Sequence, residues 1–223
     1  LIVPLKLNRT YNSLAHENDE SAFGFGWSFT FGAKLKVNRF IEGDPNTEIM
    51  CVSVTWEDGR TDVYDRLTDG SYLPPLGVTD QLTKEGEFWT VVKQDKTRYR
   101  FNMDGNLQLV YTPNSVVSEN PAENNTCVVF EYSGLVVTKV IAPSTEPAAR
   151  RELEITWTSF ANPKKPGDTM AVVTRITDNQ GMETTYEYEE SAGVLKRVNY
   201  GTNHDNCILY GYDNHGRLNS ISQ

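Results

Sequence analysis

The sequence contains little of what metal-binding, redox and disulfide-rich proteins share. It has three histidines and three cysteines in 223 residues, and no Cys-x-x-Cys pair occurs. Zinc and thiol-redox motifs therefore have no support. An odd number of cysteines also argues against a disulfide framework, so we expect free, mostly buried thiols at Cys51, Cys127 and Cys207. We expect no cofactor and no bound metal.

Positive charge is scarce as well. Lys and Arg number 21 against 30 Asp and Glu, which leaves a net charge of −9 without any cluster of basic residues. A protein that binds nucleic acid through its phosphates needs such a cluster, so we expect no nucleic-acid partner. No apolar run is long enough to span a bilayer, and there is no secretory signal. The chain begins without Met, which we interpret as the sign of a piece of a longer protein.

Strand-forming residues, by contrast, occur along the whole chain. Short runs rich in Val, Ile, Thr, Tyr, Phe or Trp predict strands. In the run at 184–189 the tyrosines fall on one face and the glutamates on the other, which is the period of a half-buried strand. No window shows a convincing helical stripe, so the predicted fold class is all-β. The predicted strands are 49–56, 61–64, 89–93, 97–101, 107–111, 127–132, 135–141, 153–158, 171–176, 184–188, 195–200 and 207–212.

Turn signals separate these runs. Asp-Gly pairs stand at 58–59, 69–70 and 104–105, and longer versions at 178–181 and 213–216. Asp-Gly supplies the positive φ angles that primed hairpin turns require. The chain therefore predicts an antiparallel meander of successive β-hairpins in a single β-sheet. Longer loops are expected at 15–21, 114–125, 143–150 and 162–168.

An internal repeat combines an aromatic strand, a turn and a leucine. Its clearest copy is Tyr210-Gly-Tyr212-Asp213-Asn-His-Gly216-Arg217-Leu218. A second copy with the same spacing is Tyr99-Arg-Phe101-Asn-Met-Asp-Gly105-Asn-Leu107, and a third, with one inserted residue, contains Tyr186, Tyr188, Gly193 and Leu195. The second aromatics of the full and partial copies stand at 101, 132, 157, 188 and 212, which fits one hairpin per repeat.

The pattern has a direct physical reason. Alternate aromatics bury a large area on one face of the strand, the turn reverses the chain, and the leucine packs back on the same face. One hairpin alone is marginally stable in water, so each repeat depends on its neighbours. We interpret the motif residues as structural.

The copy at 210–218 resembles the Y-x-Y-D-x-x-G-R-L signature of YD repeats, found in Rhs proteins, Tc-toxin shell subunits and teneurins. The runs at 4–13 (Pro-Leu-Lys-Leu-Asn-Arg-Thr-Tyr-Asn-Ser) and 23–29 (Phe-Gly-Phe-Gly-Trp-Ser-Phe) are similar to the segment that opens the bacterial Rhs core. Asn102, Ser133 and Glu189 stand where the motif has Asp, so those copies depart from it. The resemblance predicts an opening segment at 1–85 and YD-like hairpin repeats at 86–223.

The resemblance implies a long sheet of hairpins that spirals into a hollow shell. Such a shell encloses a C-terminal toxin domain or presents a surface domain. It also implies that the partner is the remainder of the same polypeptide, and that the parent protein is extracellular or at the bacterial cell surface. The family's self-cleavage site lies beyond the repeats and has no match here, so we expect no enzymatic activity. Unpaired sheet edges of an excised piece would invite dimerisation by strand addition.

One group of carboxylates could suggest hydrolysis. Glu187, Glu189 and Glu190 could be read as a glycosidase acid pair. Side chains at i and i+2 of a strand lie roughly 7 Å apart, which falls between the separations of retaining and inverting enzymes. An exposed sheet face explains the same residues without chemistry.

Two further groups also have simpler explanations. His204, Asp205, Cys207 and His215 could bind a metal, but their spacing matches no compact ligand motif. The Gly24-Phe-Gly26 run lacks the strand–turn–helix context of a phosphate loop, and a close-packed turn accounts for it.

Three functions compete. The leading hypothesis is a non-catalytic structural segment of an Rhs/YD-repeat shell. The alternative is a cell-surface module that binds a glycan or a partner protein through an exposed aromatic sheet face around Trp56, Trp89 and Trp157, and full burial of these side chains would count against it. A hydrolase is the third, and it would need a cleft with a carboxyl pair of raised pKa.

Overall fold

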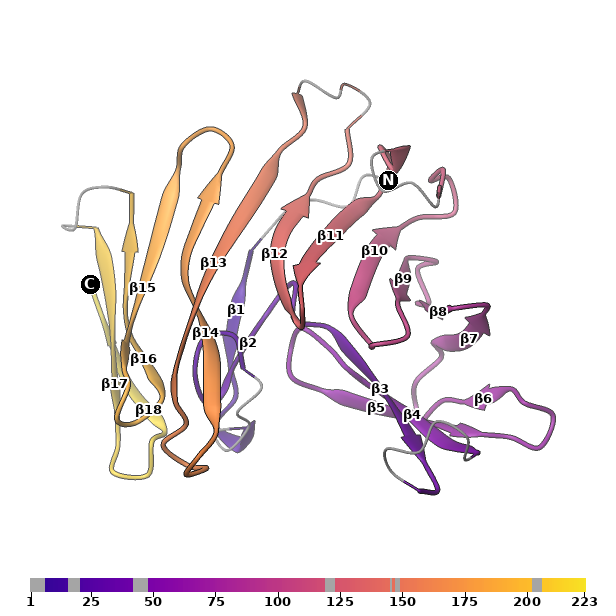
Figure 1. Ribbon diagram of the computed structural model, residues 1–223, viewed down its shortest axis with the longest axis horizontal. Coiled ribbons are helices and arrows are strands. Elements are labelled where there is room, and N and C mark those ends of the chain that lie inside the picture. Colours follow the sequence, from indigo (N-terminus) through magenta and orange to yellow (C-terminus); the bar gives the residue numbers. More distant parts are fainter. Residues whose placement is uncertain are drawn as a thin grey trace.

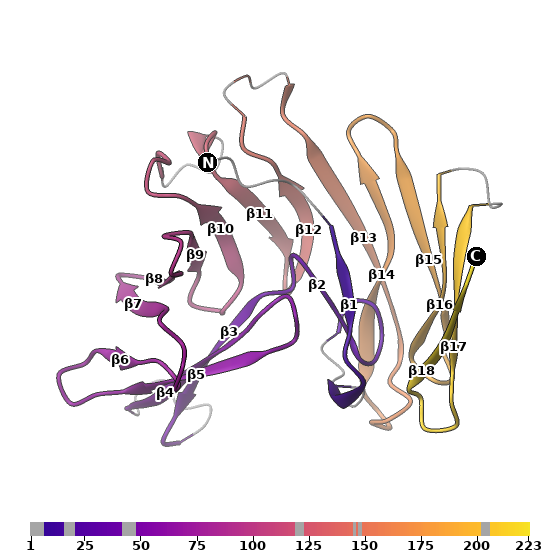
Figure 2. The ribbon, with the colours of Figure 1, turned by 180° about the vertical axis from the view of Figure 1, so that it is seen from behind.

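The computed structural model describes residues 7–15, 21–41, 48–118, 123–144, 146, 149–201 and 206–223, which form an all-β fold. Figures 1 and 2 show a long curved sheet with the N-terminal strands against one of its faces. The described part of the chain includes a 3-10 turn, η1 (Ser13–Ala15), and none of its helices is long and apolar enough to cross a membrane. The predicted fold class, an antiparallel all-β meander, is confirmed.

The large sheet contains twelve strands, and each pairs antiparallel with the next one along the chain. Its order is therefore that of a continuous meander from β7 at one edge to β18 at the other. The strands are β7 (Gln81–Glu85), β8 (Phe88–Val92), β9 (Arg98–Phe101), β10 (Leu107–Tyr111), β11 (Val128–Ser133), β12 (Val136–Ile141), β13 (Glu152–Ala161), β14 (Thr169–Asp178), β15 (Glu183–Glu189), β16 (Val194–Tyr200), β17 (Cys207–Tyr212) and β18 (Leu218–Ser222).

The remaining strands form two small sheets. One pairs β1 (Arg9–Tyr11) with β2 (Trp27–Phe29), and the other contains β3 (Lys34–Arg39), β4 (Ile49–Thr55), β5 (Thr61–Arg66) and β6 (Tyr72–Leu73). This hydrogen bonding differs from the predicted single sheet. The chain leaves the four-stranded sheet at Pro74 and Pro75, which have no backbone N–H to continue a ladder.

All twelve predicted strands are present, with ends that differ by a few residues. Sequence reasoning missed β1, β2, β3, β6 and β7 and gave only the start of β18. These strands are short, or they are rich in Lys, Gln and Asn, as in Lys34–Arg39 and Gln81–Glu85. Their pairing comes from neighbouring strands, which intrinsic propensity does not include.

The Asp-Gly turns are not primed turns, which corrects the sequence interpretation. At the β17–β18 turn the Gly216 N–H donates to the Asp213 carbonyl at 2.9 Å, and the Asp213 N–H donates to the Arg217 carbonyl at 2.9 Å. Gly216 has a φ of 74°, and among the described non-glycine residues only Lys96 has a positive φ. The arrangement is a three-residue loop, a type I turn followed by one left-handed glycine. Asp keeps ordinary backbone angles because its Cβ makes the left-handed region costly.

The core lies between the large sheet and the N-terminal strands. We call the face of the large sheet that carries Phe101, Phe130, Val173 and Leu195 the inner face, and all four side chains are buried. A smaller cluster around Leu109 and Val129 packs separately from this core.

Candidate interaction site on the inner face

The copy of the repeat motif at residues 210–218 shows the physical role of each motif residue. Tyr210 and Tyr212 lie on β17, and Leu218 begins β18 opposite Tyr212. Asp213 Oδ1 accepts hydrogen bonds from the N–H groups of His215 (2.8 Å) and Arg217 (2.9 Å), and Oδ2 accepts from Arg217 Nε at 2.9 Å. These bonds, led by the Arg217 N–H, lower the pKa of Asp213 to about 2. Asp and Arg of the motif therefore close the turn from both sides.

The copy at residues 99–107 forms the same turn with Asn in place of Asp. Asn102 Oδ1 accepts a hydrogen bond from the Asn106 N–H at 2.9 Å, and the Gly105 N–H donates to the Asn102 carbonyl at 3.0 Å. Phe101 is fully buried and lies opposite Leu107 across the hairpin. An amide oxygen thus replaces the carboxylate without loss of the turn, although it carries no charge.

The third copy turns later because of its inserted residue. The Gly193 N–H donates to the Glu189 carbonyl at 2.9 Å, and Leu195 again lies opposite the second aromatic, Tyr188. Tyr186 is buried while Glu187 is exposed, as the alternation of the sequence predicts.

Five cross-strand pairs of this kind form what we call the aromatic ladder. In each hairpin the ladder aromatic lies opposite an aliphatic residue, and the strand register shifts immediately beside the pair. Such bulges bend and twist a hairpin at a chosen position. The pairs are Phe101–Leu107, Tyr132–Val137, Trp157–Val173, Tyr188–Leu195 and Tyr212–Leu218.

The polar ends of the last three aromatics bond to the backbone of the preceding pair. Trp157 Nε1 donates to the Val137 carbonyl at 2.7 Å, and the Tyr188 hydroxyl donates to the Val173 carbonyl at 2.6 Å. The Tyr212 hydroxyl donates to the Leu195 carbonyl at 2.8 Å.

Three successive hairpins are thereby each tied to the one before by a half-buried ring and one hydrogen bond.

Burial of these rings changes their titration. Desolvation raises the pKa of Tyr132, Tyr188 and Tyr212 well above the ordinary tyrosine value, because burial penalises the charged form. Desolvation likewise raises the pKa of Tyr186 to about 12, with Arg9 opposing the shift. The hydroxyls therefore stay neutral and act as hydrogen-bonding groups rather than as acids or bases.

The N-terminal segment, by which we mean residues 7–15 and 21–33, packs on the inner face near the end of the ladder. Trp27 Nε1 donates to the Tyr212 hydroxyl at 3.0 Å, and the Leu218 N–H donates to the Tyr11 hydroxyl at 2.9 Å. The Tyr11 and Trp27 rings meet edge to face with centroids 5.3 Å apart. Figure 2 shows β1 and β2 in front of the large sheet, over β13 and β14.

Two turn glycines of the repeats lie very close to residues of the N-terminal strands and turns. A Cβ on Gly193 would lie 2.4 Å from the Phe25 ring, and the Phe25 N–H donates to the Gly193 carbonyl at 3.0 Å. A Cβ on Gly105 would lie 1.7 Å from the Leu35 carbonyl oxygen. The Gly24–Gly26 run, with positive φ at both glycines, is therefore a close-packed turn in contact with the repeats, as its simpler interpretation has it.

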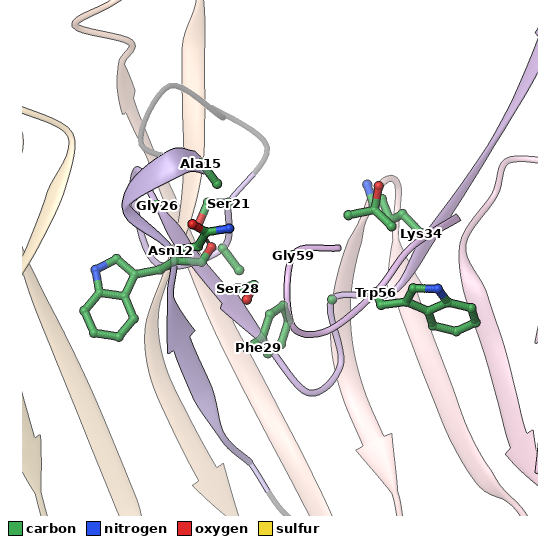
Figure 3. A pocket seen from close by; sticks show the side chains of 13 residues that line it. Asn12, Ala15, Ser21, Gly26, Ser28, Phe29, Lys34, Trp56 and Gly59 are labelled. Carbon is green, nitrogen blue, oxygen red and sulfur yellow. Dashed lines mark hydrogen bonds between the residues drawn. The ribbon is translucent and has the colours of Figure 1, made fainter. Parts of the chain in front are cut away.

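A cavity of about 100 Å³ separates the N-terminal segment from the β4–β5 turn. Figure 3 shows its lining, with Asn12 and Ser28 on one side and Trp56 and Gly59 on the other. Lys34 is the one ionisable residue in this lining. The cavity is smaller than ordinary ligand pockets and has no acid–base pair. It is a packing gap between two elements rather than a substrate site.

The tryptophans proposed as an exposed binding face are largely in the core. Trp89 is fully buried and Trp56 is 3% exposed, while Trp157 is half-buried and bonds to the Val137 carbonyl. Trp56 Nε1 donates to Asp62 at 2.6 Å. This burial counts against the aromatic binding face.

The candidate catalytic and metal residues are not brought together as a site. Asn199 Nδ2 donates to Glu187 at 2.9 Å, and Glu189 lies 4.0 Å from Lys196 at the surface. The described residues contain no group of three or more His, Cys, Asp or Glu side chains placed to hold a metal ion. His204 and Asp205 lie outside the described residues, and the neighbouring turn places His215 Nδ1 4.0 Å from Asp213.

Comparisons with known proteins found one family model and a small number of distant relatives, each matching part of this chain. A family model described as a domain of unknown function, DUF6531, matches residues 1–64. The tRNA nuclease WapA of Bacillus subtilis (strain 168) is 30% identical over 105 residues, which is 45% of this chain and 4% of the relative. The tRNA3(Ser)-specific nuclease WapA of Bacillus spizizenii is similar to the same extent. The chain is thus similar to a small part of much longer nucleases.

Proposed function

We propose that this chain is a non-catalytic wall segment of an Rhs/YD-repeat shell that encloses or presents a C-terminal toxin or effector domain. The observation that carries the proposal is the aromatic ladder, in which the last three hairpins each bond to the one before. A ladder built in this way extends by adding hairpins, because each new aromatic needs only the backbone of the preceding pair. This is the construction that a long curved wall requires.

The comparisons support the proposal in two ways. The similarity to 4% of a far longer nuclease is what a structural segment of a multidomain protein would show. The match over residues 1–64 covers the region where the sequence resembles the opening of the Rhs core. We assign nuclease activity to other parts of such proteins, and we propose that this segment binds no nucleic acid, consistent with its net charge of −9.

The remaining features of the proposal follow from the shell. The partner of the segment is the remainder of its own polypeptide, the parent protein acts at the bacterial surface or outside the cell, and this segment does not insert into membranes. The β18 edge supports further pairing, because its residues are largely exposed and β17 is its one neighbouring strand. In an isolated piece the same edge would allow dimerisation by strand addition.

The first experiment is the mass of the native parent protein from its producing cell, under denaturing and then native conditions. We expect a chain well above about 100 kDa, the scale of a shell built from many such hairpins, and a cleaved domain that co-purifies natively. A native product near the size of this segment would contradict the shell.

A second experiment separates the segment from the activity named in its relatives. The isolated chain is incubated with total tRNA beside a known ribonuclease. We expect no cleavage, because a chain with a net charge of −9 and no cluster of basic residues is poorly suited to bind the phosphates of RNA. Cleavage that persists through repurification would show that the segment is an enzyme.

A further inference from the structure

Arg9 is a half-buried cation that has no counter-ion among the described residues. Its Nη2 donates to the Tyr200 hydroxyl at 3.0 Å, and its guanidinium lies 5.1 Å from the centroid of the Tyr186 ring and 5.9 Å from that of Phe23. Its Nη1 is buried and has no hydrogen-bond partner. Among the described residues no carboxylate is within ion-pair distance of Arg9, although the chain contains 30 acidic residues.

Arg9 lines a cavity of about 660 Å³ between β1 and the inner face of the large sheet. The volume is in the range of ordinary small-molecule sites. Aromatic rings and neutral polar groups make up much of the remaining lining, which includes Asn8, Thr10, Trp27, Thr184 and Tyr210.

The one carboxylate in the lining is already neutralised. Asp178 accepts from Arg151 Nη2 at 2.8 Å and from the Met182 N–H at 2.9 Å. These bonds lower the pKa of Asp178, the Met182 N–H having the largest effect. Asp178 is therefore a satisfied anion, and the uncompensated charge in the cavity is that of Arg9. Buried charges in proteins are ordinarily paired, because an unpaired ion loses its hydration without replacement.

We propose that this cavity binds an acidic sugar, with its carboxylate on Arg9 and its ring against Tyr210. A single guanidinium matches the charge of one carboxylate, to which it can donate a charge-assisted hydrogen bond. A phosphate carries more charge and is ordinarily held by several bases or by converging backbone N–H groups. The hydroxyls and amide of Thr10, Thr184 and Asn8 suit sugar hydroxyls. The inference rests on the described residues alone and stands or falls independently of the shell.

The test measures binding of digalacturonate to the 223-residue chain by calorimetry, with galactobiose of the same linkage as the neutral counterpart. We expect digalacturonate to bind and galactobiose to bind roughly tenfold more weakly or worse, because the charged hydrogen bonds are lost. Equal affinity for the two sugars would overturn the role of the carboxylate. Displacement of digalacturonate by inorganic phosphate at equal concentration would overturn the choice of a sugar.

The matched variants are Arg9→Gln and Arg175→Gln. Both changes remove one positive charge. Arg175 is the control because it lies on β14 of the large sheet, outside the cavity lining, with its side chain 51% exposed. We expect Arg9→Gln to lose digalacturonate binding by roughly tenfold or more and Arg175→Gln to retain it. Equal binding by the two variants would place the sugar elsewhere.

A measurement on the unchanged protein guards against loss of folding in Arg9→Gln. The NMR signals of the Arg9 Nε–Hε group and of the Trp27 indole N–H are followed as digalacturonate is added. We expect both to shift along one saturating curve. Absence of a shift at both groups, with binding detected by calorimetry, would exclude this cavity.

Discussion

The hairpins of the large sheet and the N-terminal segment are stabilised by contacts of very different range. Within the ladder, Trp157 bonds to Val137 and Tyr188 to Val173, so each tie reaches back by a single hairpin. In the N-terminal segment, Tyr11 bonds to Leu218 across almost the entire chain. Contacts of short range form at low entropic cost, whereas those of the N-terminal segment need the sheet to exist first. The hairpins thus form a scaffold, and the N-terminal segment depends on it.

The largest expected effect comes from Gly105, a turn glycine of the large sheet that contacts β3 directly after the N-terminal segment. Gly105→Ala places a Cβ 1.7 Å from the Leu35 carbonyl oxygen, and Leu35 N–H also donates to the Gly105 carbonyl. We expect the free energy of unfolding to fall by about 4 kcal/mol, the scale of severe core strain.

The matched control is Gly181→Ala, measured in the same urea titrations. Gly181 has a φ of 85° and nothing within 4 Å of its missing Cβ. It should therefore lose only about 1 kcal/mol, the cost of a left-handed alanine. Equal losses in the two variants would mean that the close approach of Gly105 to Leu35 contributes nothing.

The next effect concerns one hydroxyl that serves both regions. Tyr212 donates to the Leu195 carbonyl within the ladder and accepts from Trp27 Nε1 of the N-terminal segment. Tyr212→Phe leaves both partners unpaired, so we expect a loss of about 2 kcal/mol in the free energy of unfolding.

The control for this change is Tyr210→Phe on the same strand. The Tyr210 ring packs on Trp27 with centroids 5.0 Å apart, but its hydroxyl has no hydrogen bond to a described residue. We expect a change within about 0.5 kcal/mol. Faster hydrogen exchange of the Trp27 indole N–H in Tyr212→Phe alone would locate the loss at the contact between the regions.

A smaller effect is expected at alkaline pH. Burial raises the pKa of Tyr186 to about 12 from an ordinary 10.0. The unfolded chain therefore loses this proton first, so stability is fully present below pH 10 and declines as the pH rises toward 12. Tyrosinate absorbance and circular dichroism followed together should change in one transition. Complete ionisation of the tyrosines near pH 10 with the sheet intact would contradict their burial.

The smallest effect concerns the exposed turn at Asp213. Its folded pKa of about 2 lies below the ordinary 3.8, so its contribution is present above pH 3.8 and is lost as the pH falls through 2. Asp213→Asn should lower the melting temperature slightly at pH 7 and leave it unchanged at pH 2. Asn102 already forms the same turn with an amide. A loss that is the same at both values would mean that charge plays no part.

Much of the fold could be predicted, because strand signals are local. The twelve predicted strands exist, and Tyr186 and Glu187 lie on the faces that alternation assigns to them. The Asp-Gly positions were correctly predicted as turns, but the predicted primed type was wrong. In these turns only the glycine has a positive φ, because a Cβ makes the left-handed region costly for Asp. The two edge-like strands at 34–39 and 81–85 carry too little propensity to be recognised.

The candidate site was much less accessible to prediction. The sequence places Arg9 in a motif of the opening segment, and nothing near it indicates a cavity. Its neighbours Tyr186 and Tyr200 come from strands that lie far along the chain. Burial of Trp56 and Trp89 was equally invisible, since an aromatic in a strand favours a core and a binding face alike.

The sequence by itself determined the strands, the turns and the period of the repeat, because each depends on residues a few positions apart. Only the tertiary structure decided that the ladder aromatics bond backward to the preceding hairpin, that Gly105 and Gly193 contact Leu35 and Phe25, and that Arg9 has no counter-ion among the described residues. These features join residues that are remote in sequence. Their energies depend on distances and burial that exist only after the sheet has formed.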